Sequence, residues 1–121
     1  MKLLVVEDSA LIRRRLLELL EGIAGIDTRA TSATLAETLT DARRDLPTFI
    51  LLDLNLPDGN AMTIIPTLKN LPSAPRIAVL TNHAGALTRS QCLLAGADWF
   101  FDKSTEFKQA LDVVRAQAAR P

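Results

Sequence analysis

Short apolar runs recur along the chain, and the two clearest runs end in acidic residues. The run 3–6 ends at Glu7 and Asp8, and the run 49–52 ends at Asp53. Continuous apolar runs of this length are typical of strands covered on both faces, as in the parallel sheet of an α/β domain. Weaker runs predict three further strands, at 26–30, 76–80 and 99–101.

Between these runs, apolar residues recur at the spacing of amphipathic helices. The first helix is expected between a Ser9 cap and Gly22, and its apolar positions are Leu11, Ile12, Leu16, Leu19 and Leu20. Further helices are predicted at 33–42, along a stretch that carries Met62, Ile65 and Leu68, at 86–94 and at 105–119. Pro66 lies inside the third helix, which is therefore expected to be kinked or short, because an interior proline costs ~3 kcal/mol.

The alternation of strands and helices predicts a parallel sheet with right-handed crossovers and helices on both faces. In such sheets ligands bind beyond the carboxyl ends of the strands. If the first and third strands are neighbours, Glu7, Asp8 and Asp53 converge at that rim. Their mutual repulsion is costly unless a cation is bound or one carboxyl is protonated, which indicates a site and not a requirement of the fold.

Length and composition agree with one compact domain over 1–121, large enough to bury a core without metal or disulfide links. Lys plus Arg and Asp plus Glu both number 14, so the zero formal charge implies no bulk attraction to nucleic acid or to a membrane. A single cysteine, Cys92, cannot form an internal disulfide. The sequence shows no secretion signal and no apolar stretch of membrane-spanning length, so we expect a cytoplasmic location.

Four predicted strand ends carry Glu7-Asp8, Asp53, Thr81 and Lys103. The segments around them, 6–9, 52–59, 80–82 and 96–103, resemble the receiver domain of two-component response regulators, in a chemotaxis-regulator-like form. The resemblance covers the whole chain. It implies a doubly wound, flavodoxin-like (βα)5 fold whose five-stranded parallel sheet has the strand order 2-1-3-4-5.

The resemblance also implies a role for each position. Asp53 would accept a phosphoryl group from a sensor histidine kinase or a histidine phosphotransfer protein. Asp8, Asp53 and the backbone carbonyl of Asn55 would hold Mg²⁺, and Glu7 would act on it through water. Lys103 would bind a phosphoryl oxygen as a compact cation.

A switch is implied as well. The Thr81 hydroxyl would donate a hydrogen bond to the phosphoryl group, and Phe100 would then change between outward and inward rotamers. The surface formed by the helix 86–94, the aromatic strand and the last helix would change with it. This surface would bind a downstream protein target, an output domain outside this chain, or a second copy in a phosphorylation-dependent homodimer, with no direct contact to nucleic acid or membrane.

Each match also has a simpler interpretation as a helix cap, a turn residue or a solvated strand end. Phe100 is nearly as well explained by packing, and the arginines at 13–15 by a solvated helix face that borders the rim. Nothing structural requires two acids, a hydroxyl and an amine at four strand ends, so the functional interpretation is favoured. Because Met1 opens directly on the first strand, we expect a stand-alone regulator or a domain cut at its boundary.

Several positions depart from the commonest family pattern. Ser104 follows Lys103 where proline is usual, so a trans peptide bond is predicted there. Asn82 crowds the approach to the phosphoryl group, and Asn55 and His83 flank the expected position of the attacking water, which leaves the phosphorylated lifetime open. Two other functions remain: an interaction domain that acts without phosphorylation, and a Mg²⁺-dependent aspartyl phosphohydrolase. Asn55 argues against the hydrolase, which needs a second acid at that position.

Overall fold

The computed structural model describes residues 1–120 and contains a five-stranded parallel sheet. Its strands are β1 (Lys2–Val6), β2 (Thr28–Ser32), β3 (Phe49–Leu52), β6 (Arg76–Thr81) and β7 (Trp99–Asp102). They lie in the order β2-β1-β3-β6-β7, which is the predicted 2-1-3-4-5 order of a doubly wound fold. The central strands β1 and β3 are buried at each of their apolar positions because helices cover both faces.

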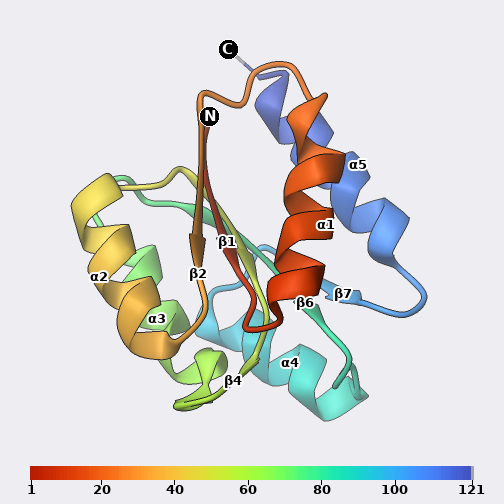
Figure 1. Ribbon diagram of the computed structural model, residues 1–121. Coiled ribbons are helices and arrows are strands. Elements are labelled where there is room, and N and C mark those ends of the chain that lie inside the picture. Colours follow the sequence, from red (N-terminus) through yellow and green to blue (C-terminus); the bar gives the residue numbers. More distant parts are fainter. Residues whose placement is uncertain (121) are drawn as a thin grey trace.

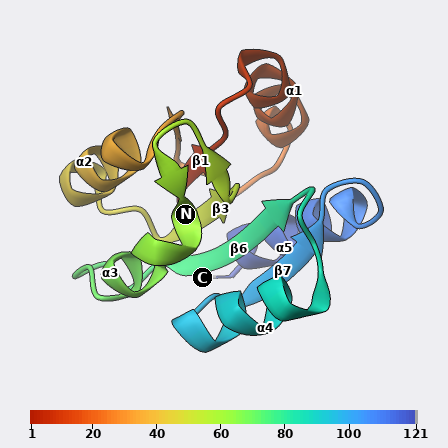
Figure 2. The same ribbon diagram turned by 90° about the horizontal axis from the view of Figure 1, so that it is seen from below.

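Helices pack on both sides of the sheet. They are α1 (Ala10–Glu21), α2 (Leu35–Asp45), α3 (Ile65–Lys69), α4 (Ala86–Ala95) and α5 (Phe107–Ala118), and a short 3₁₀ turn at Ala61–Ile64 precedes α3. Figures 1 and 2 show α1 and α5 on one face, and α2, α3 and α4 on the other. None of the helices in 1–120 is both long enough and apolar enough to cross a membrane.

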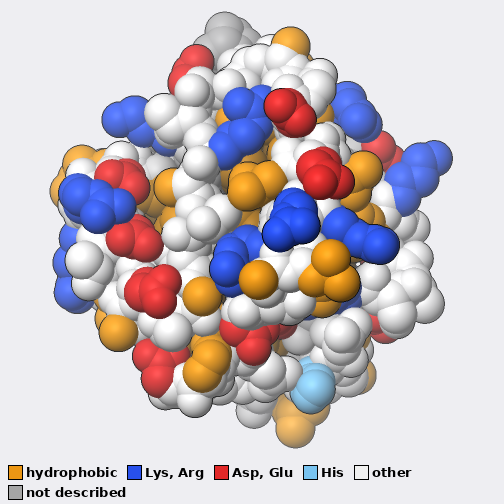
Figure 3. Space-filling model, in the orientation of Figure 1, with side chains coloured by type: hydrophobic (Ala, Val, Ile, Leu, Met, Phe, Trp, Pro, Cys, Tyr) orange, Lys and Arg blue, Asp and Glu red, His pale blue; other side chains and the backbone are white. Residues whose placement is uncertain are grey.

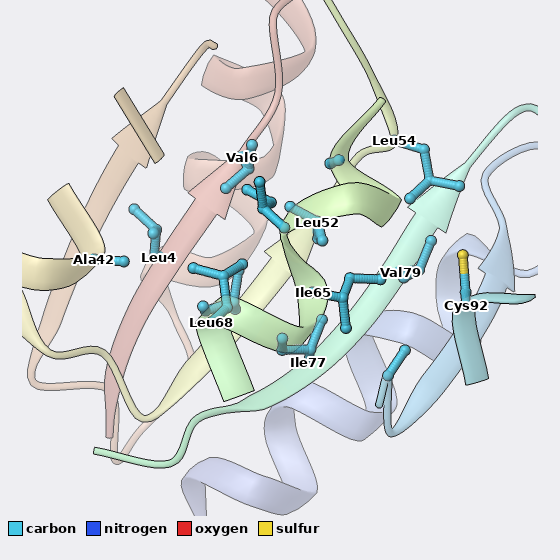
Figure 4. Packing of buried hydrophobic residues seen from close by; sticks show 14 of the residues in the cluster. Leu4, Val6, Ala42, Leu52, Leu54, Ile65, Leu68, Ile77, Val79 and Cys92 are labelled. Atoms are coloured by element: carbon cyan, nitrogen blue, oxygen red, sulfur yellow. The ribbon is translucent and has the colours of Figure 1, made fainter. Parts of the chain in front are cut away.

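Alternate residues of each strand supply two separate cores. On β1, Leu3 and Val5 pack with α1 and α5, whereas Leu4 and Val6 pack with α2, α3 and α4. Figure 4 shows the second core, where helix residues such as Leu68 lie against the sheet. The aromatic strand β7 contributes side chains to both cores. Phe100 packs in the core with α4, whereas Trp99 and Phe101 pack against the core with α1 and α5.

Helices α3 and α1 differ in how well they follow the pattern of the sequence. The expectation of a kinked or short helix at Pro66 is confirmed, because the proline lies in the first turn of the five-residue α3, where a missing N–H does no harm. The apolar positions noted in α1 do not all face the sheet. Leu16 and Leu20 are buried, but Leu11 is 60% exposed and Leu19 is 50% exposed, because α1 touches the sheet along a narrower stripe than the leucine pattern suggests.

The segment after β3 forms a small hairpin. Its strands are β4 (Asn55–Leu56) and β5 (Gly59–Asn60). At its tip, the Asp58 carboxylate accepts hydrogen bonds from the backbone N–H groups of Leu35 at 2.7 Å and Ala36 at 3.1 Å. These bonds satisfy free donors at the start of α2 and hold the hairpin against that helix.

Candidate functional site

The predicted site residues lie at the ends of four strands, and these ends share one rim of the sheet, which faces the viewer in Figure 2. Glu7 and Asp8 follow β1, Asp53 follows β3, Lys103 follows β7, and Thr81 is the last residue of β6. Because β1 and β3 are paired up to their last residues, the chain leaves both strands at the same level. The Asp53 N–H donates to the carbonyl of the last β1 residue at 3.0 Å and fixes that level.

Three carboxylates meet at this rim. One oxygen from each of Glu7, Asp8 and Asp53 lies within 4.8 Å of the others. Glu7 is only 2% exposed and Asp53 only 8%, whereas Asp8 faces solvent. The convergence predicted from the sequence is therefore present, and two of the three acids are inside the molecule, where an uncompensated charge is costly.

Lys103 compensates part of this charge. Its Nζ donates to Glu7 Oε1 at 2.6 Å and to Asp53 Oδ2 at 3.3 Å. Burial alone would lower the pKa of Lys103, but the hydrogen bond to Glu7 and the charge of Asp53 raise it above its ordinary value. Three carboxylates and one ammonium leave two negative charges, and this balance suits a divalent cation with oxygen ligands.

The loop that carries the first two acids is held by α1. Ser9 caps the helix, as predicted, by accepting the N–H of Ile12 at 3.3 Å, and its own N–H donates to Glu7 Oε2 at 3.2 Å. Arg13 Nη1 donates to the backbone carbonyl of Glu7 at 2.8 Å and to that of Asp8 at 3.3 Å. The arginine thus fixes the backbone between the two acids.

This role of Arg13 was not predicted from the sequence. A solvated face is correct for Arg14 and Arg15, which are exposed, but wrong for Arg13, which is half-buried. Figure 3 shows basic side chains gathered over the lower part of α1, with hydrophobic side chains beside them. The signal that could have identified Arg13 is its place one turn beyond the Ser9 cap, where a long side chain can reach back to the strand end.

A cavity of about 260 Å³ opens above the acids. Its lining residues are Glu7, Asp8, Ser9, Ile12, Asp53, Asn55, Asn82, His83 and Lys103. Asn55, Asn82 and His83 are exposed at this cavity, so three of the four departures noted in the sequence lie at its surface, and Ser104 is the one that does not line it. A larger cavity of about 380 Å³ lies at the amino-terminal ends of β1 and β2, and none of the three clustered acids lines it.

Thr81 and Phe100 do not line the cavity above the acids. Thr81 is fully buried, and its Oγ1 accepts the N–H of His83 at 3.2 Å. Phe100 is 4% exposed and packs in the same core as Cys92, so its ring points inward. The backbone links Thr81 to the site, since the Lys103 N–H donates to the Thr81 carbonyl at 2.9 Å. The switch roles of Thr81 and Phe100 remain predictions.

The peptide bond after Lys103 is trans, as the serine at 104 predicted. The family model described as the response regulator receiver domain matches residues 3–115. The chain belongs to this family. The receiver fold found in the structure and the order of the polar strand ends agree with that assignment.

Curated relatives carry the receiver domain in longer proteins. The chain is 31% identical over 107 residues to protein-glutamate methylesterase/protein-glutamine glutaminase 4 of Hahella chejuensis, covering 88% of this chain and 28% of that one. It is 28% identical over 102 residues to the DNA-binding transcriptional activator DevR/DosR of Mycobacterium tuberculosis, covering 84% and 47%. The chain thus spans less than half the length of either relative.

Solved structures show the same fold. A two-component response regulator of the LuxR family from Aurantimonas sp. is 25% identical, with a TM-score of 0.82 over 96% of this chain and 85% of that one. The signal receiver domain of a DNA-binding response regulator from Colwellia psychrerythraea is 16% identical, with a TM-score of 0.88 over 99% of each chain. The second likeness bears on the fold alone.

Proposed function

We propose that this receiver domain, over 1–121, is a phosphoacceptor in two-component signalling and that Asp53 receives the phosphoryl group. The donor would be the phosphohistidine of a sensor histidine kinase or of a histidine phosphotransfer protein. The observation that carries the proposal is the contact of Lys103 with both Glu7 and Asp53 beneath an open cavity. A kinase partner and a cytoplasmic site of action follow from this role. The proposed domain includes Pro121, which lies outside the residues that the structure describes.

The proposed reaction needs little from the protein beyond placement. A carboxylate oxygen of Asp53 attacks phosphorus, a P–O bond forms, and the P–N bond of the phosphohistidine breaks, so that the imidazole leaves and takes up a proton. Catalysis of such transfers is mostly positioning and stabilisation of charge on the equatorial oxygens. Lys103, already 3.3 Å from Asp53, is placed to hold one of these oxygens.

The donor set fits Mg²⁺. Carboxylate oxygens within 4.8 Å of one another and a net charge of minus two match a hard divalent ion that keeps several waters. Asp8, Asp53 and the backbone carbonyl of Asn55 would hold the ion, with Glu7 acting through water. When bound, Mg²⁺ supplies positive charge to the phosphoryl oxygens.

We further propose that the output surface consists of α4, β7 and α5. The Thr81 hydroxyl, which accepts the N–H of His83, would donate its own hydrogen to the phosphoryl group, and the movement of its loop would free space for Phe100. On α4, Leu87 is 71% exposed and Leu94 is 88% exposed, which suits a protein partner better than nucleic acid. That partner would be a target protein, an output domain or a second copy of the chain in a phosphorylation-dependent homodimer.

Two other functions make different predictions. An aspartyl phosphohydrolase needs an acid to protonate the leaving group, and Asn55 at the cavity cannot supply this proton. An interaction domain without phosphorylation would not require a lysine shared between two buried acids. Asn82 and Ser104 are the departures that favour this second alternative.

The test is the intact mass of the protein after incubation with a small acyl phosphate donor and Mg²⁺. Wild type should gain one phosphoryl group, and Asp53→Asn should gain none. Asp112→Asn, which changes an exposed acid on α5, is the matched control and should behave as wild type. No gain in wild type, with no donor turnover, would leave the interaction domain as the better account.

A further inference from the structure

The loop between β7 and α5 is folded around the carboxylate of Asp102. Its Oδ1 accepts the backbone N–H of Ser104 at 2.9 Å and the Ser104 hydroxyl at 2.6 Å. The two hydrogen bonds from Ser104, and weaker ones from Thr105, hold the pKa of Asp102 below its ordinary value. The turn immediately after Lys103 is therefore closed by a charged acceptor.

A second carboxylate supports the same turn from the other side. Glu106 Oε1 accepts the N–H of Asp102 at 3.0 Å, and the N–H of Glu106 donates to the Asp102 carbonyl at 2.7 Å. Asp102 is thus bonded through its N–H, its carbonyl and its side chain. All of these bonds lie within five residues of the chain, and Lys103 is one of the five.

These contacts are not a helix cap. Helix α5 begins at Phe107 after Glu106, and no side chain caps its first turn. The Asp102 carboxylate instead binds Ser104, which precedes the helix by three positions. The network therefore shapes the lysine turn and does not serve the end of α5.

Lys103 is consequently fixed at both ends. Its N–H is bonded to Thr81 of the neighbouring strand, and the next N–H in the chain is bonded to Asp102. Its Nζ reaches Glu7 and Asp53 from this position. The turn sets where the Lys103 side chain begins, so a change in the turn would move the ammonium group, and misplacement of a catalytic group by about 1 Å can reduce a rate up to 10²-fold.

We propose that Asp102, acting through Ser104, is a positioning residue that aims Lys103 at the acceptor carboxylate. The mechanical part stands on the contacts of the turn, and the catalytic part rests on the proposed phosphoacceptor function. Ser104 is then more than a substitute for an absent proline, because its N–H and hydroxyl are the groups that Asp102 gathers. Neither side chain touches the reacting atoms.

The experiment compares Asp102→Ala, Asp102→Asn and Ser104→Ala with the control Asp112→Ala. Asparagine keeps the Oδ1 acceptor and should retain most of the wild-type behaviour. The first readout is the extent of labelling of Lys103 by an amine-reactive reagent, measured by peptide mass spectrometry. The second is the rate of phosphorylation at increasing concentrations of acetyl phosphate, with saturating Mg²⁺.

In Asp102→Ala, labelling of Lys103 should rise several-fold while that of the exposed Lys108 stays constant. The maximal rate should fall on the order of tenfold with an unchanged half-saturating donor concentration, because alignment and not donor binding is lost. Ser104→Ala should change both readouts in the same direction by less. Unchanged labelling, or unchanged maximal rate despite increased labelling, would overturn the proposal.

Two features keep the result decisive. If Asp102→Ala does not fold, as judged by circular dichroism, the other two variants still test the proposal. Ser104→Ala loses the hydroxyl donor of the turn, whereas Asp102→Asn keeps the Oδ1 acceptor, so the two should differ in both readouts. Labelling does not depend on phosphorylation. If wild type takes up no phosphoryl group, the proposed function fails, and constant labelling across the variants is then what would refute the positioning role.

Discussion

Lys103 lies closer to Glu7 than to Asp53, at 2.6 Å against 3.3 Å between the bonded atoms. The shorter hydrogen bond of the ammonium group is therefore the one to Glu7, and the longer one is to Asp53, the proposed acceptor. Glu7 is also the most deeply buried of the three carboxylates. We interpret Glu7 as the residue that holds Lys103 in readiness beside Asp53.

Replacement of Lys103 by methionine, which is similar in size, should destabilise the fold and slow phosphorylation. It leaves two buried carboxylates facing each other, and breaking a buried ion pair from one side costs roughly 3 kcal/mol. The free energy of unfolding from urea titration measures the first effect, and Lys108→Met, on the exposed side of α5, is the control. Equal stability of the two variants would show that the pair contributes nothing.

Asp8→Asn should weaken Mg²⁺ binding by about tenfold or more with little effect on stability, since hard cations favour charged oxygen ligands and this side chain is exposed. Isothermal titration calorimetry measures the affinity, with Asp112→Asn as the matched change of charge. A wild-type affinity in Asp8→Asn would remove this residue from the proposed ligand set.

Arg13→Ala should lower both metal affinity and stability, because the carbonyls of Glu7 and Asp8 lose their shared donor. A hydrogen bond from a charged donor contributes about 1.5–3 kcal/mol, and exposure of the loop places the expected loss at the lower end. Arg14→Ala removes a neighbouring exposed arginine and should change neither quantity. Equal metal affinity and equal stability of the two variants would show that the Arg13 contacts contribute to neither.

Acid should reveal the bond between the hairpin and α2. Hydrogen bonds from the N–H groups of Leu35 and, less, Ala36 hold the pKa of Asp58 below its ordinary value of 3.8. A depressed pKa in the folded state contributes stability above the unfolded value, and this contribution is lost as pH falls through the folded value. The stability difference between wild type and Asp58→Asn should therefore be constant near neutral pH and shrink below about pH 4. Urea titrations across this range measure it, and a difference that does not shrink with pH would contradict the assignment.

The sequence predicted the parts of the fold that depend on burial. The runs before Glu7 and Asp53 are covered on both faces, and such coverage leaves an unbroken apolar pattern. The edge strand β2 was predicted two residues early, at 26–30, because its half-exposed sequence has no such pattern. The β4–β5 hairpin left no periodic signal at all, since two-residue strands are held by their own backbone bonds and by Asp58.

The part of the site that depends on the order of the strands could be predicted, and its local contacts could not. Pairing of the parallel strands β1 and β3 brings Glu7 and Asp53 together, as expected if the first and third strands are neighbours. Lys103 follows β7, which lies beyond β6, and reaches both acids with its long side chain; its place at the site was inferred from the family resemblance. The contacts of Arg13 and the closed turn at Asp102 depend on side-chain direction over a few residues, which a pattern of residue types does not contain. These local contacts hold the backbone on either side of the site, at Glu7 and Asp8 and after Lys103.

The central claim is that Asp53 is the residue that becomes phosphorylated, and the most direct measurement locates the covalent group. After incubation with acetyl phosphate and Mg²⁺, borohydride reduction converts an acyl phosphate to an alcohol, and peptide mass spectrometry then identifies the changed residue. The account predicts conversion at Asp53, dependent on both donor and Mg²⁺, with Asp8 and Asp58 unchanged. Conversion at another carboxylate, or none under conditions in which a known receiver domain is converted, would contradict it.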